Sequence, residues 1–87
     1  MITDDELNEI EMRCLAAQPS DWQAYIEGIH HTSGSDFIMT GIGGERGDDL
    51  EILGGTVDDL IFVAHARGDI LRLIEEIRVL RRGLGRG

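Results

Sequence analysis

The sequence of 87 residues contains no lysine, a single cysteine and a single proline. The lack of lysine excludes the phosphate-binding loop that ends in Gly-Lys-Ser or Gly-Lys-Thr. With Cys14 as its only cysteine, the chain can form neither an intramolecular disulfide nor a four-cysteine zinc site. The helical spacing of Cys14 from Leu7 and Ile10 instead predicts a small, buried, hydrophobic side chain.

Long apolar runs are also absent, and no segment approaches the roughly 18–20 apolar residues that cross a bilayer. The first residues, MITDDE, are acidic where a signal peptide needs a basic start. We therefore expect a cytoplasmic protein that does not contact a membrane. The length predicts one domain over residues 1–87, with 83–87 as a frayed basic tail and with marginal stability.

The net charge of −9 is unevenly distributed along the chain. Residues 1–66 hold fourteen acids against two arginines, a balance of −12, and residues 67–87 hold six arginines against three acids, a balance of +3. Such acidity disfavours nonspecific binding to nucleic acid, so we expect no direct nucleic-acid partner. Two explanations fit the use of arginine in place of lysine: a GC-rich genome, or a need for the guanidinium fork that grips carboxylates and phosphates.

The pattern of apolar and turn residues predicts an α+β fold. We expect an N-terminal helix, a small three-stranded antiparallel meander, and two C-terminal helices or one kinked helix in their place. The first helix should begin at Thr3, which forms a capping box with Glu6, and should end near Gln18.

Three β-prone segments follow, over residues 22–27, 37–42 and 50–53. The short loops between them favour antiparallel pairing of successive strands. Because side chains alternate along a strand, the first segment should direct two different sets to its two faces. One face is predicted to carry Trp22, Ala24 and Ile26, and the other Gln23, Tyr25 and Glu27.

Gly68 divides the C-terminal helical region in this prediction. Thr56 can cap a helix that ends near Arg67, and Asp69 can cap another over residues 70–82. Alternatively Gly68 only kinks one helix, at a cost of about 1 kcal/mol. The part before Gly68 should be largely buried, because it is apolar around most of its circumference. The sheet is one surface that can cover it, and a partner chain is another. Its apolar residues are Val57, Leu60, Ile61, Phe62, Val63, Ala64 and Ala66.

The part after Gly68 carries a seam of apolar residues at the spacing of a coiled coil. Two readings of this seam remain open: packing within the monomer, or pairing with another copy. Short chains often gain stability by oligomerisation, and we expect a homo-oligomer. The seam consists of Ile70, Leu73, Ile77, Leu80 and Leu84.

No segment carries a complete catalytic or metal-binding motif. The glycine-rich run over residues 41–47 has Arg46 where a dinucleotide fingerprint needs its third glycine, and a strand follows it instead of a helix. The run fits a hairpin turn, although consecutive glycines can also form a nest for an anion. The adjacent His30 and His31 point in opposite directions at a strand end. We therefore expect no enzyme, no metal site and no cofactor.

Two segments of the chain carry a family resemblance. Residues 16–22, AAQPSDW, are similar to an AATPGPW motif, and residues 62–78, FVAHARGDILRLIEEIR, are similar to FIAHARxDIPxLLxEIxxLR. The chain thereby resembles a large family of short proteins encoded by bacteriophages and prophages of actinobacteria and Gram-positive bacteria. Ser20 and Asp21 replace Gly-Pro, and Leu71 replaces a proline. The change at Leu71 weakens the case for a full break between the C-terminal helices.

The resemblance implies a phage protein that acts in the cytoplasm of the host bacterial cell. Small phage proteins without a catalytic motif often counter host immunity, and this implies a binding role. The favoured role is a sponge that sequesters a nucleotide-derived signalling molecule. The alternatives are an acidic protein–protein inhibitor that mimics nucleic acid on a defence complex, and a structural or regulatory accessory protein.

For a nucleotide-like small molecule the predicted site combines aromatic rings with arginines. A base can stack on Trp22 and Tyr25, while Arg67 and Arg72 hold phosphate. Asp69 can bind a ribose hydroxyl or orient an arginine. The competing reading is that each arginine forms a surface salt bridge of little energetic consequence. The complete predicted set is Trp22, Tyr25, Gly43, Gly44, Arg46, His65, Arg67, Asp69 and Arg72.

Overall fold

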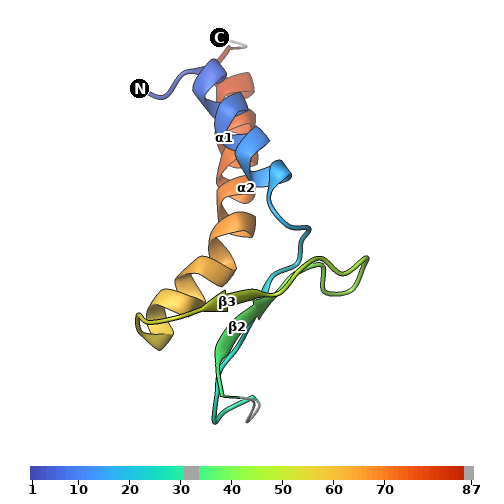
Figure 1. Ribbon diagram of the computed structural model, residues 1–87. Coiled ribbons are helices and arrows are strands. Elements are labelled where there is room, and N and C mark those ends of the chain that lie inside the picture. Colours follow the sequence, from blue (N-terminus) through green and yellow to red (C-terminus); the bar gives the residue numbers. More distant parts are fainter. Residues whose placement is uncertain (31–33, 86–87) are drawn as a thin grey trace.

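The computed structural model describes residues 1–30 and 34–85, so His31 and the end of the expected tail, residues 86–87, lie outside the described residues. Its strands form one antiparallel sheet in the order β1-β2-β3, which confirms the predicted meander (Figure 1). Within the described residues, none of the helices combines the length and the apolar character needed to span a bilayer. The elements are α1 (Asp4–Ala16), β1 (Gln23–Tyr25), β2 (Asp36–Met39), β3 (Leu50–Ile52) and α2 (Val57–Gly85).

Helix α1 begins at the predicted capping box. The backbone N–H of Glu6 donates to the Thr3 hydroxyl at 3.0 Å, and the backbone N–H of Thr3 donates to the Glu6 carboxylate at 3.0 Å. Three acidic residues in the first turn also suit the positive end of the helix dipole. Leu7 and Cys14 are buried, which confirms the prediction of a buried cysteine.

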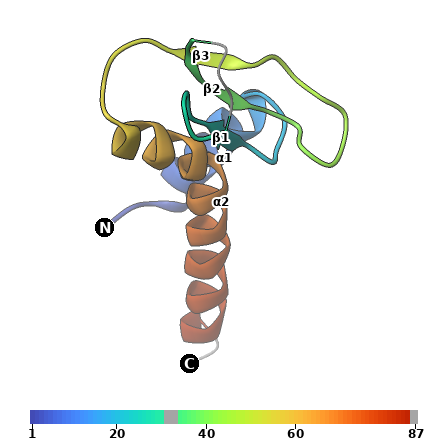
Figure 2. The same cartoon turned by 90° about the horizontal axis from the view of Figure 1, so that it is seen from below.

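The C-terminal region is one continuous helix, α2, so the expectation of two separate helices is wrong. Thr56 begins it, with reciprocal hydrogen bonds to Asp59 of 2.8 and 3.2 Å. Gly68 lies within the helix and has no positive φ. A glycine inside a helix costs only about 1 kcal/mol, which the packing on both sides of Gly68 outweighs. The alternative of one kinked helix fits, because α2 changes direction in its middle (Figures 1 and 2).

The two halves of α2 pack against different partners. Its N-terminal half crosses the sheet, where Leu60 and Ala64 form a core with Ile26 of the segment after β1 and Ile38 of β2. Its C-terminal half runs beside α1, where Ile74 is buried. The molecule is therefore elongated, with the sheet at one end and the helix pair at the other (Figure 1).

The prediction that the first part of α2 is largely buried is wrong for the single chain. Of its apolar residues only Leu60 and Ala64 are buried, and Phe62 is 73% exposed. The reason is the size of the sheet: three short strands cover one side of a helix and leave the rest of its circumference open. The other exposed residues of this part are Val57, Ile61 and Val63.

The packing of α2 against α1 uses a different stripe from the predicted seam. Arg78 donates to Glu11 at 2.6 Å and to Asn8 at 2.8 Å, while Arg81 pairs with Asp4 at 2.6 Å and also donates to the carbonyl of Ile2. The hydrogen bond to Glu11 raises the pKa of Arg78 above its ordinary value. Contact within the monomer therefore leaves much of the seam uncovered: Leu73, Leu80 and Leu84 are exposed.

The core at the sheet can be tested with one conservative change made at two sites. Ile38 is fully buried, whereas Ile29 is 72% exposed. Ile38→Val should lower the free energy of unfolding by about 1 kcal/mol, because it removes a buried methylene. Ile29→Val should change it by less than about 0.5 kcal/mol. Urea denaturation followed by circular dichroism measures both, and equal losses for the two variants would contradict the described core.

The continuity of α2 can be tested in the same way with Gly→Ala. A Cβ on Gly68 meets no atom within 4 Å, so Gly68→Ala should raise the free energy of unfolding by up to about 1 kcal/mol. At Gly41, where φ is +70°, a Cβ would collide with the carbonyl oxygen of Glu45, so Gly41→Ala should destabilise the protein. Loss of stability in the Gly68 variant would show that the helix is broken there.

Candidate binding site

Trp22 lies where the sheet, α1 and α2 meet. Its indole N–H donates to the carbonyl oxygen of Gln18 at 3.0 Å, which fixes the ring at the start of β1. The ring packs partly against the sheet core, on the face that β1 directs toward α2, as the alternation of side chains predicted. Because the ring lines several cavities around this junction, Trp22 is the central residue of the candidate site.

A small cavity of about 230 Å³ opens beside Trp22, and we refer to it as the polar cavity. It brings together several residues that the sequence singled out, from the segment that precedes β1 and from the middle of α2. It also contains two carboxylates, Asp21 and Asp69, which balance much of the positive charge. The polar cavity is lined by Ser20, Asp21, Trp22, Ala64, His65, Arg67, Gly68, Asp69 and Arg72.

The arginines at this cavity differ in their partners from Arg46, Arg78 and Arg81. Within residues 1–30 and 34–85, neither Arg67 nor Arg72 forms an ion pair, whereas Arg46, Arg78 and Arg81 each do. The Nε atom of Arg67 is buried and has no hydrogen-bond partner. A buried donor without a partner costs roughly 1–3 kcal/mol, so an acceptor supplied by a ligand would be favourable here. The reading of Arg67 and Arg72 as surface salt bridges finds no support in the described contacts.

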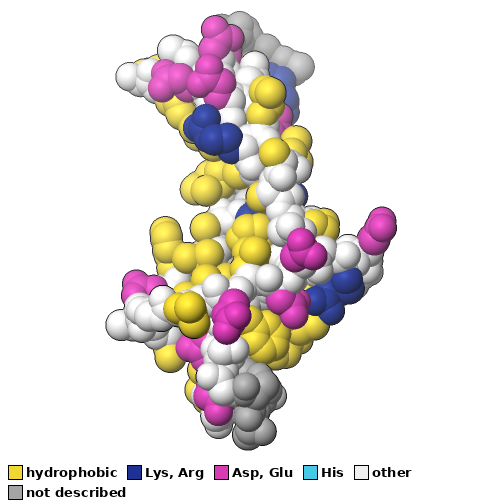
Figure 3. Space-filling model, viewed as in Figure 1, with side chains coloured by type: hydrophobic (Ala, Val, Ile, Leu, Met, Phe, Trp, Pro, Cys, Tyr) yellow, Lys and Arg dark blue, Asp and Glu magenta, His cyan; other side chains and the backbone are white. Residues whose placement is uncertain are grey.

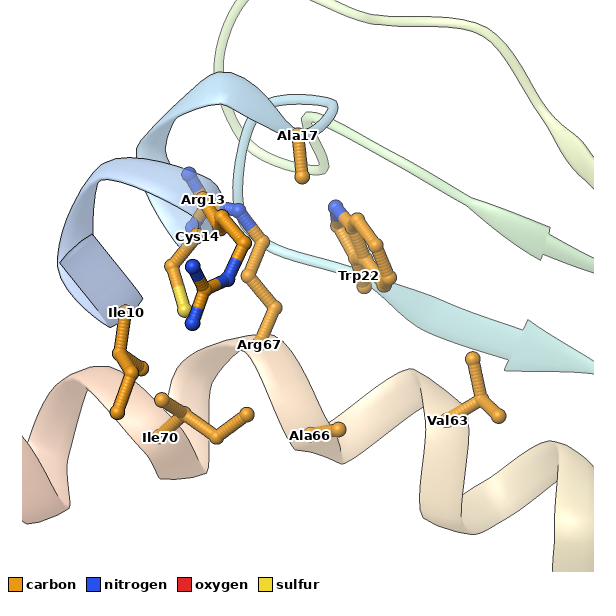
Figure 4. A pocket seen from close by; sticks show the side chains of 9 residues that line it. All are labelled: Ile10, Arg13, Cys14, Ala17, Trp22, Val63, Ala66, Arg67 and Ile70. Carbon is orange, nitrogen blue, oxygen red and sulfur yellow. The ribbon is translucent and has the colours of Figure 1, made fainter. Parts of the chain in front are cut away.

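A second cavity, which we call the apolar groove, lies between α1 and α2 and has a volume of about 420 Å³. It shares Trp22 and Arg67 with the polar cavity, and Figure 4 shows the guanidinium groups of Arg13 and Arg67 between the two helices. Its lining contains no carboxylate. The apolar groove is lined by Ile10, Arg13, Cys14, Ala17, Trp22, Val63, Ala66, Arg67 and Ile70.

The two cavities lie on opposite sides of α2. Successive helical residues are separated by about 100°, so residues 63, 66 and 70 project from one side and residues 65, 68 and 72 from the other. Side chains on the first side are mostly apolar, and those on the second side are polar or charged. The middle of α2 therefore presents two chemically different surfaces, with Trp22 and Arg67 between them.

Tyr25 lies away from the polar cavity, although the sequence grouped it with Trp22. The Tyr25 ring stacks on Phe37 with centroids 5.5 Å apart and meets the edge of His30 at 5.7 Å. Tyr25 stands three positions after Trp22, an odd number, so the alternation of side chains directs the two rings to opposite faces of the sheet. A base stacked on Trp22 cannot also stack on Tyr25.

The glycine-rich turn also lies apart from the polar cavity. The N–H groups of Gly41 and Ile42 donate to the carbonyls of Pro19 and Asp21, at 2.8 and 3.0 Å, and the Gly44 N–H donates back to Gly41. The Arg46 side chain donates to the Thr40 carbonyl and pairs with Asp49 at 2.7 Å. The turn therefore braces the connection between α1 and β1 and does not close over the cavity. Gly43, Gly44 and Arg46 do not line the polar cavity.

The polar cavity brings one indole ring, two guanidinium groups and two carboxylates together. Among residues 1–30 and 34–85, no group of three His, Cys, Asp or Glu side chains is arranged to hold a metal ion. His65 is exposed at the rim of the polar cavity. Sequence reasoning missed Arg13 as a cavity residue. Its helical spacing from Ile10 and Ala17 placed it on the same side of α1, and this signal could have found it.

No protein-family model matches the chain, and no curated protein and no solved structure shows significant similarity to it. The resemblance to short phage proteins therefore stays a prediction.

Proposed function

We propose that the protein is a binding protein that captures a phosphorylated, nucleotide-like small molecule in the polar cavity. The observation that carries the proposal is the convergence of one indole ring and two guanidinium groups on a single concave surface. Among the residues that the structure describes, neither guanidinium group has an ion-pair partner. Each group has a separate task in holding such a ligand.

Trp22 supplies the stacking surface. Its ring is already fixed by the hydrogen bond to Gln18, so little rotational freedom is lost when a base stacks on it. Stacking of a base on an aromatic side chain contributes about 1–3 kcal/mol and tolerates different bases. The cavity offers few hydrogen bonds to the edges of a base. Stacking, which tolerates different bases, is therefore the main contact that it can make with a planar base.

Arg67 and Arg72 supply the phosphate contacts. They stand five residues apart on α2, and both side chains reach the cavity beside Trp22. A guanidinium group binds phosphate through two parallel hydrogen bonds, and these charge-assisted bonds are roughly twice as strong as neutral ones. Asp69, whose side chain lines the same cavity, would accept a hydrogen bond from a ribose hydroxyl.

The size of the site fits a ligand that is held on one side and exposed on the other. The polar cavity alone, at about 230 Å³, is smaller than most ligand pockets. It continues along α2 into a broader depression of about 510 Å³ that shares Asp69 and Arg72. The base and one phosphate would occupy the polar cavity, and the remainder of the ligand would lie along α2.

The biological role that we propose for this binding is sequestration. The site supplies groups that hold a ligand and none that are paired to break a bond, and the sequence resembles phage proteins that act inside a host cell. A phage protein of this kind would lower the free concentration of a nucleotide-derived immune signal. An acidic inhibitor of a defence complex is the alternative, and it requires no role for Trp22, Arg67 or Arg72.

Binding can be tested by titrating the full chain with cyclic dinucleotides, cyclic ADP-ribose and ADP-ribose in a calorimeter. We expect at least one of them to bind. Arg67→Gln and Arg72→Gln should each weaken that binding by about tenfold or more, because each removes a charged hydrogen bond. If none of the three classes binds, and native mass spectrometry of the chain incubated with host lysate shows no retained small ligand, the proposal is wrong.

Two control variants distinguish this site from the wider site expected from the sequence. Arg82→Gln changes an exposed arginine far along α2, and Arg46→Gln changes the arginine of the glycine-rich turn. Both should leave the affinity unchanged. If Arg46→Gln weakens binding as much as Arg67→Gln does, the ligand does not lie in the polar cavity.

A further inference from the structure

An exposed apolar stripe runs along the whole length of α2, on the side that faces away from the polar cavity. It continues the predicted seam toward the sheet, because Phe62 and Ala66 precede Ile70 at four-residue spacing. Leu73 is 62% exposed, Leu80 is 56% exposed and Leu84 is 81% exposed. We call this surface the α2 stripe. The apolar groove adjoins it at Ala66 and Ile70, and Figure 3 shows hydrophobic side chains gathered around the narrow middle of the molecule.

The accessible surface of the chain is larger than a compact monomer of its mass requires. The chain exposes 6316 Å², whereas a folded monomer of 9.6 kDa exposes about 5,100 Å². The radius of gyration is 16.1 Å, compared with about 12 Å for a compact domain of this length. The excess of about 1,200 Å² is more than the roughly 800 Å² that each partner buries in a standard protein–protein interface.

We propose that a second copy of this chain packs on the α2 stripe and forms a two-fold symmetric dimer. The exposed area favours this occupant, because one interface of standard size would bury about 800 Å² of the excess of about 1,200 Å² on each chain. The seam spacing fits as well, because alternating steps of three and four residues allow two helices to interlock side by side. A membrane surface is a poor occupant, since the chain carries a net charge of −9 and anionic lipids would repel it.

The charges beside the stripe favour parallel helices in the dimer. One border of the stripe has a net negative charge, because Asp69 and Glu76 outnumber Arg72 there. The other border leads to the groove that holds Arg13 and Arg67. Within the described part of the chain, none of these five side chains forms an ion pair. A two-fold axis parallel to the helices brings the acidic border of one copy against the basic border of the other. An axis perpendicular to the helices would bring like charges together.

The oligomeric state and the surface can be tested together by sedimentation equilibrium on the full chain. We expect the mass of a dimer, twice 9.6 kDa. The double change Leu73→Glu with Leu80→Glu places charges on the stripe and should raise the dimer dissociation constant by roughly thirtyfold or more. The matched control is Leu53→Glu, because Leu53 is 85% exposed but lies before α2 and off the stripe. The control should remain a dimer, and circular dichroism checks that both variants are folded.

Crosslinking tests whether the two α2 helices are parallel in the dimer. It does not require a variant with a charged side chain in the interface. In a background of Cys14→Ala, the only thiol of the Leu80→Cys variant sits on the stripe. Parallel helices place the two copies of this residue opposite each other, so mild oxidation should give a covalent dimer in high yield. A monomer at all concentrations would overturn the proposal, and so would an oligomer that the double change leaves intact. A dimer that does not crosslink at this position would overturn the parallel arrangement.

Discussion

The unbroken course of α2 through Gly68 is the constraint on which the rest of the molecule depends. The sheet is attached to the N-terminal half of this helix through Leu60 and Ala64, and α1 is attached to the C-terminal half through Ile74 and the Arg78 hydrogen bonds. A flexible joint at Gly68 would let the two halves move apart. The only other link described between them is the connection from α1 to β1, which the Gly41 and Ile42 amides hold in place.

Both cavities exist because of this arrangement. Trp22 lies at the point where the sheet, α1 and α2 meet, so its ring borders the space on each side of the helix. The polar side carries His65 and Arg72, and the apolar side carries Ala66 and Ile70. The helical repeat separates these two sets, and an elongated chain with few layers leaves both accessible. The ligand site and the association surface therefore lie on different sides of one helix and meet at its borders, where both involve Arg67 and Asp69.

Sequence reasoning succeeded where a local rule decides the structure and failed where the amount of neighbouring surface decides it. The Thr3–Glu6 capping box, the strand periodicity and the meander are local, and all are present. The apolar circumference of α2 showed which residues gain stability when buried. Periodicity does not show whether three short strands have enough surface to cover them. The alternation of side chains along β1 already predicts opposite faces for Trp22 and Tyr25, so this rule argues against grouping the two rings in one site. Whether Gly68 breaks a helix depends on tertiary packing. Here the stabilisation from packing exceeds the cost of a glycine inside a helix, which is about 1 kcal/mol.

The arginines illustrate why charge along the sequence is a poor guide to charge in space. The positive balance of residues 67–87 suggested a basic region, yet Arg78 and Arg81 pair with acids of α1 and attach that helix to α2. The charges of Arg78 and Arg81 therefore serve to hold α1 against α2. Arg13, by contrast, belongs to the acidic part of the chain and still lies beside Arg67 in a groove that contains no carboxylate. The local positive charge at Trp22 therefore arises from two arginines that are distant in sequence and have no ion pair within the described residues, in a protein whose overall charge is strongly negative.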